Sequence, residues 1–410
     1  MSTEPPFDVV VVGGGMVGAS LALALSGLPL RMAVIEPVLP GADAQPSFDD
    51  RCTSLANGSR RMLDTIGAWP AIAGHAAIIE AIHVSDAGQP GSALITAKEL
   101  DLPALGVTAP NRASGAALWE ALRAQQRVEL LAPARVLAVR TLDGGVELDV
   151  GAADGAVRTL IARLAVAADG DRSLIRQAAG IGATQLDFEQ VAIVANISAQ
   201  RAAAGVAYER FGAADGPLAL LPRPDGHFTV VWTVAAQAAA ALLQASTDDF
   251  LQRLQAAFGW RVGAFERVGK RASYPLTLSR ATQTVAPRTA LVGNAAQALH
   301  PVAGQGFNLG LRDAAVLAEL IADSADAGDA GLLAEYQRRR AVDRDRMISF
   351  TDGLLRLFAL KFPGAARLRG LGLMLFDSAP PAKQALSGVS WGFSASTPRL
   401  LRGLTAGGAR

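Results

Sequence analysis

Cysteine is almost absent from this chain of 410 residues, in which Cys52 is the one example. A single thiol can form neither an internal disulfide nor a metal cage built from cysteines. Histidine is also scarce, and the four histidines lie in separate segments without metal-ligand spacing, at His75, His83, His227 and His300. The sequence therefore predicts no internal disulfide and no metal site.

Net charge is nearly absent as well, because 38 Lys and Arg balance 37 Asp and Glu to give +1. A surface that binds nucleic acid normally shows as a basic excess, so we expect no nucleic-acid partner. The charge is uneven, however, since residues 351–410 contain eight Lys and Arg and, as acids, Asp352 and Asp377. This segment is the basic region of the chain.

The sequence also lacks a convincing membrane span. Its most apolar stretch runs from Val9 to Leu30, but glycines interrupt it, and residues 1–8 carry acids in place of Lys or Arg. A signal peptide has a basic leader, and a spanning helix needs about 20 apolar residues. We therefore expect a cytoplasmic protein without a transmembrane helix.

The N-terminal region has the pattern of a dinucleotide-binding unit. After a run of four valines, Gly13, Gly15 and Gly18 form a GxGxxG motif at the start of an Ala- and Leu-rich helix, and the next strand ends at Glu36. The first glycine permits a tight turn, the second lets a pyrophosphate approach, and the third allows close packing of helix on strand. The terminal acid can accept hydrogen bonds from an adenosine ribose. A purely structural glycine turn is the alternative.

A second glycine-rich segment follows the apolar strand Thr289–Val292 and leads into a helix-like run from Leu309 to Leu320. A strand, a glycine-rich turn and a helix start form a nest of backbone N–H groups, suited to an anionic or electron-rich ring. The segment therefore predicts cofactor contacts from Gly293, Asn294, Gly304, Gln305, Gly306, Phe307 and Asn308.

Between these two segments the sequence alternates more than once between the pattern of the nucleotide-binding domain and a pattern of short strands. Short strands with one covered face are expected in the second domain, including one from Ile78 to Ser85. The pattern predicts an α/β fold with a nucleotide-binding domain at 1–70, 111–180 and 281–350, a second, sheet domain at 71–110 and 181–280, and a C-terminal helical segment and tail at 351–410. The two domains are therefore expected to be interleaved.

Three motifs in this order resemble those of the class A flavoprotein aromatic hydroxylases, namely Gly13–Gly18 with Glu36, Asp169–Arg176 and Gly293–Gly310. Within that class, residues 50–56 and 299–313 look like the ubiquinone-biosynthesis hydroxylases, and the Gly-Asn-Ala-Ala-Gln form at 293–297 is similar to the branch that acts on 2-polyprenyl-6-methoxyphenol. The resemblance implies a Rossmann-like FAD-binding domain interleaved with a mainly β-sheet substrate domain.

The resemblance also implies roles for single residues. Arg51 is similar to an arginine near the FAD pyrophosphate and the nicotinamide path, and Arg112 to a position that contacts FAD phosphates; simple surface placement stays open for both. Asp169 would contact FAD from the end of a strand. Pro301 would lie against the flavin face, and N–H groups around Gly306 would stabilise negative charge near flavin N1 and O2.

One residue departs from the pattern of the class. Asn294 stands where the class usually has an aspartate that accepts hydrogen bonds from the ribityl chain. An amide oxygen still accepts and its NH₂ donates, so FAD binding is expected to survive.

The implied reaction is ring hydroxylation of a polyprenylated methoxyphenol, para to its hydroxyl, with FAD, NADPH or NADH, and O₂, through a C4a-hydroperoxyflavin. Two alternatives stay open: a flavin-dependent prenyl reductase, and a non-catalytic flavoprotein subunit of a quinone-biosynthesis complex. Other quinone-biosynthesis proteins and a second copy of the chain are candidate partners.

The C-terminal segment mixes apolar clusters with cations between Leu354 and Phe376. Such a pattern is typical of an interfacial helix, here at the inner face of the plasma membrane. The alternative is a helix that packs against the flavin domain or a second subunit.

Overall fold

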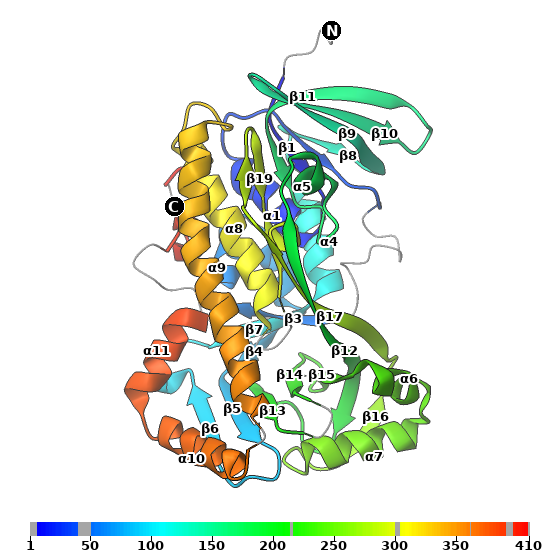
Figure 1. The fold of residues 1–410 in the computed structure, drawn as a ribbon, viewed down its shortest axis with the longest axis vertical. Coiled ribbons are helices and arrows are strands. Elements are labelled where there is room, and N and C mark those ends of the chain that lie inside the picture. Colours follow the sequence, from blue (N-terminus) through cyan, green and yellow to red (C-terminus); the bar gives the residue numbers. More distant parts are fainter. Residues whose placement is uncertain are drawn as a thin grey trace.

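The computed structural model describes residues 6–39, 51–213, 216–299, 304–360, 362–390 and 397–408. Two domains are stacked along the long axis, and helix α9 (Ala330–Ala359) runs beside both (Figure 1). The chain passes between the domains several times, since strands far apart in sequence share each sheet. The predicted interleaved α/β fold is confirmed.

The upper sheet brings together three distant parts of the sequence. Its strands are β1 (Phe7–Val12), β2 (Met32–Ile35), β8 (Val128–Leu131), β9 (Ala134–Leu142), β10 (Gly145–Ala152), β11 (Val157–Ala167), β18 (Val285–Ala286) and β19 (Thr289–Leu291). Strand β1 pairs in parallel with β2 and β11, and β11 pairs in parallel with β19. The strands that end in the two glycine turns and at Asp169 therefore lie side by side.

Both faces of this sheet are covered. Helices α1 (Met16–Leu25), α4 (Asn111–Arg123) and α8 (Gln305–Ala322) pack on the face of Val9 and Val11, with α2 (Asn57–Thr65) and α3 (Trp69–Ala73) beside them. The β9–β10 hairpin and α5 (Leu174–Ala178) cover Val10 and Val12. A parallel strand buried on both faces has no polar side to present, which explains the unbroken run of valines.

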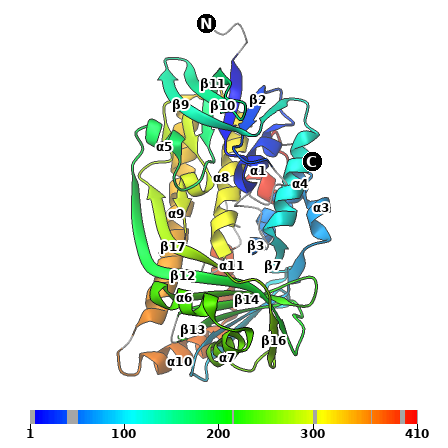
Figure 2. The same cartoon turned by 90° about the vertical axis from the view of Figure 1, so that its right-hand side faces the viewer.

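The lower sheet forms the floor of the second domain. Its strands are β5 (Ala81–Asp86), β6 (Ser92–Thr96), β12 (Ala183–Ala199), β13 (Val206–Phe211), β14 (Leu218–Pro222), β15 (Phe228–Ala235), β16 (Phe265–Val268), β17 (Ala272–Ala281) and β20 (Gln297–Ala298). Their order is β20-β17-β12-β15-β14-β13-β5-β6, with β16 on β12. Helices α6 (Ala236–Gln244) and α7 (Thr247–Phe258) cover one face. Strand β12 extends from the upper domain into this sheet (Figure 2).

A small third sheet corrects one expectation. It consists of β3 (Cys52–Ala56), β7 (Gly106–Pro110) and β4 (Ala77–Ile79). The single strand expected from Ile78 to Ser85 was wrong, because the chain leaves β4 and enters β5 of the lower sheet at Glu80. The Glu80 N–H donates to the Gly205 carbonyl at 2.7 Å, and its carbonyl accepts from the Ala97 N–H at 2.8 Å. The pattern of apolar residues continues through this change of sheet and does not reveal it.

The C-terminal helices α10 (Ala365–Asp377) and α11 (Pro380–Ser390) pack against the lower sheet, beyond β6 and the short helix η1 (Lys98–Leu100). Arg369 of α10 forms a buried ion pair with Asp86 of β5 at 2.8 Å. Lys383 of α11 pairs with Asp377 at 3.0 Å and with Glu99 at 3.2 Å. Helices α10 and α11 therefore pack within the protein on the lower sheet, whereas the packing alternative named the flavin domain or a second subunit.

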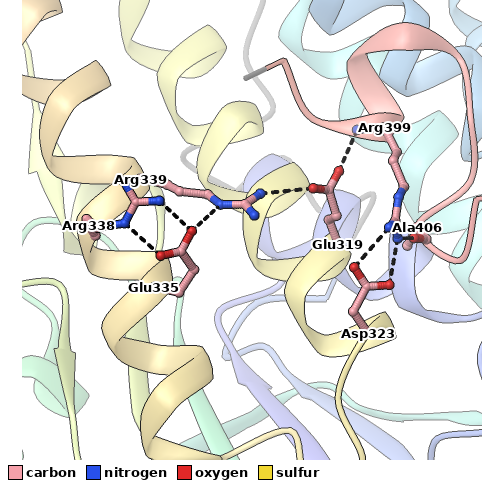
Figure 3. A network of polar contacts seen from close by, with 7 residues as sticks. All are labelled: Glu319, Asp323, Glu335, Arg338, Arg339, Arg399 and Ala406. Carbon is pink, nitrogen blue, oxygen red and sulfur yellow. Dashed lines mark hydrogen bonds and ion pairs between the residues drawn. The ribbon is translucent and has the colours of Figure 1, made fainter. Parts of the chain in front are cut away.

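The last described element, η4 (Arg399–Arg402), returns to the upper domain (Figure 3). Its Arg399 pairs with Asp323 at 2.8 Å, and the Arg399 N–H donates to Glu319 at 2.7 Å. Glu319 also pairs with Arg339 of α9 at 2.9 Å. These contacts tie η4 to α8 and α9 at once.

Membrane-spanning helices and metal-binding clusters are both absent from the described residues. None of their helices combines the length and the apolar character needed to cross a bilayer. No cluster of three or more His, Cys, Asp or Glu side chains among them could hold a metal ion.

Candidate cofactor site and adjoining cavity

A cavity of about 1530 Å³ lies between the upper domain and the lower sheet. One end is lined by the two glycine turns, Glu36 and Asp169. The other end is lined by the inner face of the lower sheet, the last turns of α9 and helix α10. Both candidate cofactor segments therefore open into one space, which continues far beyond them.

The first glycine turn has the geometry expected of it. Gly13 has φ of +104°, and a Cβ there would lie 2.4 Å from the Ala168 carbonyl oxygen. A Cβ on Gly18 would lie 2.0 Å from the Gly13 oxygen, so helix and strand are in close contact. Gly15 is the N-cap of α1 and lines the cavity, and no side chain caps the helix there. The first N–H groups of α1 are thus left for an anion.

Glu36 is 5% exposed at the end of β2 and lines the cavity. Its Oε2 accepts from the Gly14 N–H at 2.7 Å, and its Oε1 accepts from the Val38 N–H at 3.1 Å. The Trp119 indole donates to the Gly14 carbonyl at 2.8 Å. The carboxylate is therefore held against the glycine turn at the edge of the cavity, where a carboxylate oxygen can accept from the hydroxyls of a ribose.

Asp169 follows β11 and lines the same end of the cavity. Its Oδ2 accepts from the Leu174 N–H at 2.8 Å, whereas its buried Oδ1 has no hydrogen-bond partner among the described residues. Burial raises the pKa of this carboxyl above its usual range. A buried acceptor without a donor is costly, so Asp169 fits a ligand that brings a hydroxyl or N–H group.

The second glycine turn combines two left-handed residues. Gly293, at the start of η2 (Gly293–Ala295), and Gly304, the N-cap of α8, both have φ of +60°. Helix α8 begins at Gln305, four residues earlier than expected, so the N–H groups of its first turn lie in the glycine segment itself. A Cβ on Gly306 would meet no atom within 4 Å, so protein packing does not require glycine there. The free space and the positive helix end fit an electron-rich ring system.

Two further predicted site residues of this turn are Asn294 and Pro301. Asn294 is exposed and lines the cavity, as a ligand-contacting amide should. Pro301 lies outside the described residues, so its predicted place against the flavin face stays a prediction.

Asn308 lines the cavity, but its side-chain hydrogen-bonding groups are paired within the protein, so its predicted cofactor contact stays a prediction. Its Oδ1 accepts from the Ala56 N–H at 2.9 Å and from the Ser59 hydroxyl at 2.7 Å. Its Nδ2 donates to the carbonyls of Ser54 at 2.8 Å and Gly304 at 3.0 Å. An amide with all these groups paired positions the α8 turn against β3 and α2, and its side chain has no donor left for a cofactor.

The two arginines differ in position. Arg51 lines the cavity and its guanidinium lies 4.0 Å from the centre of the Tyr274 ring. Arg112 is exposed at the start of α4 and is not among the cavity-lining residues, whereas its neighbour Asn111 is. The predicted contact of Arg51 with FAD is compatible with this position, and that of Arg112 stays a prediction without a supporting contact.

The sequence did not reveal the role of Asp313. This residue is 1% exposed, and its Oδ2 accepts from the Gly293 N–H at 2.9 Å and from Gln297 at 2.7 Å. Its Oδ1 pairs with Arg340 of α9 at 2.6 Å, and Arg340 also pairs with Asp343. Asp313 therefore connects the cofactor turn to α9, a link that residue spacing does not show.

The interleaved sheets and the two glycine turns surround one cavity, and together with the family and the named relatives they identify an FAD-dependent aromatic-ring monooxygenase. The family model described as FAD binding domain matches residues 6–351, and the chain belongs to this family.

Named relatives support the same class. The chain is 39% identical to ubiquinone hydroxylase UbiL of Rhodospirillum rubrum, over 98% of this chain and 94% of that protein. It is 31% identical to 3-demethoxyubiquinol 3-hydroxylase of Escherichia coli, over 93% of this chain and 97% of that protein. Among solved structures, p-nitrophenol 4-monooxygenase PnpA from Pseudomonas putida shares the fold, with a TM-score of 0.78 at 20% identity and full coverage of both chains.

Proposed function

We propose that this protein hydroxylates the aromatic ring of a polyprenylated methoxyphenol in ubiquinone biosynthesis, with NADPH or NADH and O₂. The observation that carries the proposal is the shape of the cavity, which continues from the two glycine turns along the lower sheet to α10. A flavin would fill the polar end, and the ring would lie beyond it on the inner face of the lower sheet. An apolar tail would occupy the part lined by Leu354, Leu357, Phe362, Leu368 and Leu373.

Each part of the polar end has a task in this proposal. The N–H groups at Gly15 and the start of α1 would bind the FAD pyrophosphate, and Glu36 and Asp169 would accept from its hydroxyl groups. The N–H groups of Gly306 and Phe307 would stabilise negative charge at the positive end of α8. FAD, once bound and reduced, supplies the activated oxygen that is transferred to the ring. The apolar walls exclude water from that transfer.

One assay separates this function from its alternatives. Purified protein is given NADPH or NADH, O₂ and a methoxyphenol with a short prenyl tail, and the product is analysed by mass spectrometry. The proposal expects oxidation of the nucleotide that depends on the phenol, and a product with one additional oxygen atom. Loss of a prenyl double bond without O₂ would indicate a reductase, and bound FAD without turnover would indicate an assembly subunit. The quinone precursor that accumulates in a deletion strain identifies the ring position.

We further propose that the outer face of α10 contacts an anionic lipid surface. Leu371, Met374 and Leu375 are exposed there by 55%, 50% and 71%, and Leu368 is both 59% exposed and part of the cavity wall. A tail that enters beside Leu368 would pass from lipid to the cavity without crossing water. Charge contributes less than the basic composition suggests, because Arg369, Lys383 and Arg399 are paired with acids.

A further inference from the structure

One carboxyl group lies in the apolar part of the cavity wall. Glu209 is the middle residue of three on β13 that face the cavity, between Ala207 and Phe211. Tyr208 and Arg210 point to the other side of the sheet, where Arg210 donates to the Ala257 carbonyl. The period-two alternation of the strand therefore aims Glu209 at the ligand space.

The strands beside β13 offer Glu209 no polar partner. The register places Glu209 in one row with five residues of neighbouring strands, all of them small and apolar: Ala93, Val84, Ala219, Val231 and Val194. All of them line the cavity.

The charged group nearest to this row on β5 already has an ion-pair partner. On the same face of β5, Asp86 is bound to Arg369 of α10 at 2.8 Å. No hydrogen bond or ion pair of the Glu209 side chain occurs within the described residues, and Phe211 beside it stacks on Phe358 of α9 at 3.9 Å. Glu209 is thus a carboxyl without a counter-charge at a site that folding alone would fill with an apolar residue.

We propose that Glu209 binds the phenol hydroxyl of the substrate and takes its proton, an inference that rests on the proposed function. The phenol O–H bond breaks, the proton passes to a carboxylate oxygen of Glu209, and the electron pair stays on the phenol oxygen. The phenolate directs electron density to the ring carbon that is attacked. After hydroxylation, Glu209 returns its proton to that oxygen as the attacked carbon loses its own proton to water.

The acidity of Glu209 suits this task. Burial raises its pKa from 4.5 to about 8, so the group exchanges protons near neutral pH. A general base is most effective when its pKa lies near the working pH.

The first test measures binding without turnover. A methoxyphenol and its methyl ether are titrated into the FAD-loaded wild type, Glu209→Gln and Glu209→Leu, and followed by the flavin absorbance. At about pH 9, where the carboxyl is ionised, we expect the wild type to prefer the phenol by roughly tenfold or more, because a hydrogen bond to a charged group is stronger than one to a neutral group. Glu209→Gln should keep part of this preference and Glu209→Leu none. Equal preference in wild type and Glu209→Leu would overturn the assignment.

The second test measures hydroxylation against pH. Wild-type kcat for hydroxylated product should rise with pH through an ionisation near 8. Glu209→Gln should lose this limb and show a larger fall in kcat than rise in KM, with NAD(P)H oxidation diverted to hydrogen peroxide. Glu266→Gln, an exposed matched change on β16, should keep the limb. A wild type that hydroxylates no phenol refutes the proposed function, whereas an unchanged pH limb in Glu209→Gln refutes this inference alone.

Discussion

Two glycines of the first turn differ in backbone conformation, so substitutions can separate an effect on FAD binding from an effect on folding. Gly15 has φ of −60° and ψ of 175°, a conformation open to any residue, whereas Gly13 is left-handed. We expect Gly15→Val to fold normally and to lose FAD, because its side chain would block the pyrophosphate. Gly13→Val should instead destabilise the fold. Flavin absorbance per protein and the unfolding midpoint measure the two effects, and a yellow, fully loaded Gly15→Val would refute this role.

Asn294 can be tested by two substitutions. It is exposed and lines the cavity, so replacement should not disturb the core. Asn294→Asp should keep FAD and activity, since the class uses aspartate here. Asn294→Leu should weaken FAD binding by about 1–3 kcal/mol through unsatisfied ribityl hydroxyls. Equal FAD dissociation constants for the leucine variant and the wild type, measured by fluorescence titration, would exclude the ribityl contact.

Glu209 should also change how the folding stability depends on pH. Its pKa is raised from 4.5 to about 8 in the folded protein, so between these values the folded state holds a proton that the unfolded state has lost. Wild-type stability therefore decreases as pH rises through this window, by at most about 1.4 kcal/mol per pH unit. Glu209→Gln lacks this effect, and its advantage in unfolding midpoint over the wild type should grow from about pH 5 to about pH 8. A constant difference would show that the carboxyl is ionised throughout.

Local sequence patterns indicate some residues of the candidate site and not others, for physical reasons. Gly13, Gly18, Glu36 and Asp169 were predictable because backbone geometry and strand ends restrict which residues can stand there. The four protein partners of the Asn308 side chain could not be predicted, since they come from segments that only the tertiary fold brings together. Glu209 carries no local motif at all. Its importance appears only in the register of the neighbouring strands.

At the scale of elements, the link between α8 and α9 controls the second glycine turn. Asp313→Asn would remove one of the two carboxylate partners of Arg340, which is 3% exposed, and leave it with Asp343. Breaking a buried pair costs about 3–5 kcal/mol, and the Gly293 turn would lose its anchor, so we expect lower stability and lower FAD occupancy together.

Asp345→Asn is the matched control for this change. It breaks an exposed ion pair with Arg280 and should lower the free energy of unfolding by less than about 1 kcal/mol. Chemical denaturation of the FAD-saturated proteins compares the two. Similar costs for both variants would show that Asp313 is not a structural link.

Helix α10 calls for point substitutions. Cutting the chain after Phe350 would remove a wall of the cavity, because α9 and α10 contribute Leu354, Phe358 and Phe376 to it. We expect Leu371→Glu with Leu375→Glu to abolish flotation with anionic liposomes while FAD stays bound. Trp260→Ser, which changes a 70% exposed side chain elsewhere, should float like the wild type. Equal flotation of all three proteins would exclude α10 as the contact.

At the scale of the whole molecule, the sequence predicted the interleaved architecture because three ordered motifs fix where the chain must return to the first sheet. It could not assign the C-terminal segment, since amphipathic helices that pack and helices that bind lipid have the same composition. The structure assigns α10 to the cavity wall and leaves its other face exposed.

The upper sheet also sets the order of events during synthesis. Strand β1 leaves the ribosome first, but its neighbour β11 starts at Val157, and β19, which carries the second glycine turn, starts at Thr289. Contacts between such distant segments form slowly, because the entropic cost of closing a long loop comes before the contacts stabilise the structure. For most of translation, the first glycine turn therefore lacks the strand β19 and the second glycine turn beside it. FAD can be captured only after the second glycine turn has emerged, so a nascent chain that ends before Thr289 should remain colourless.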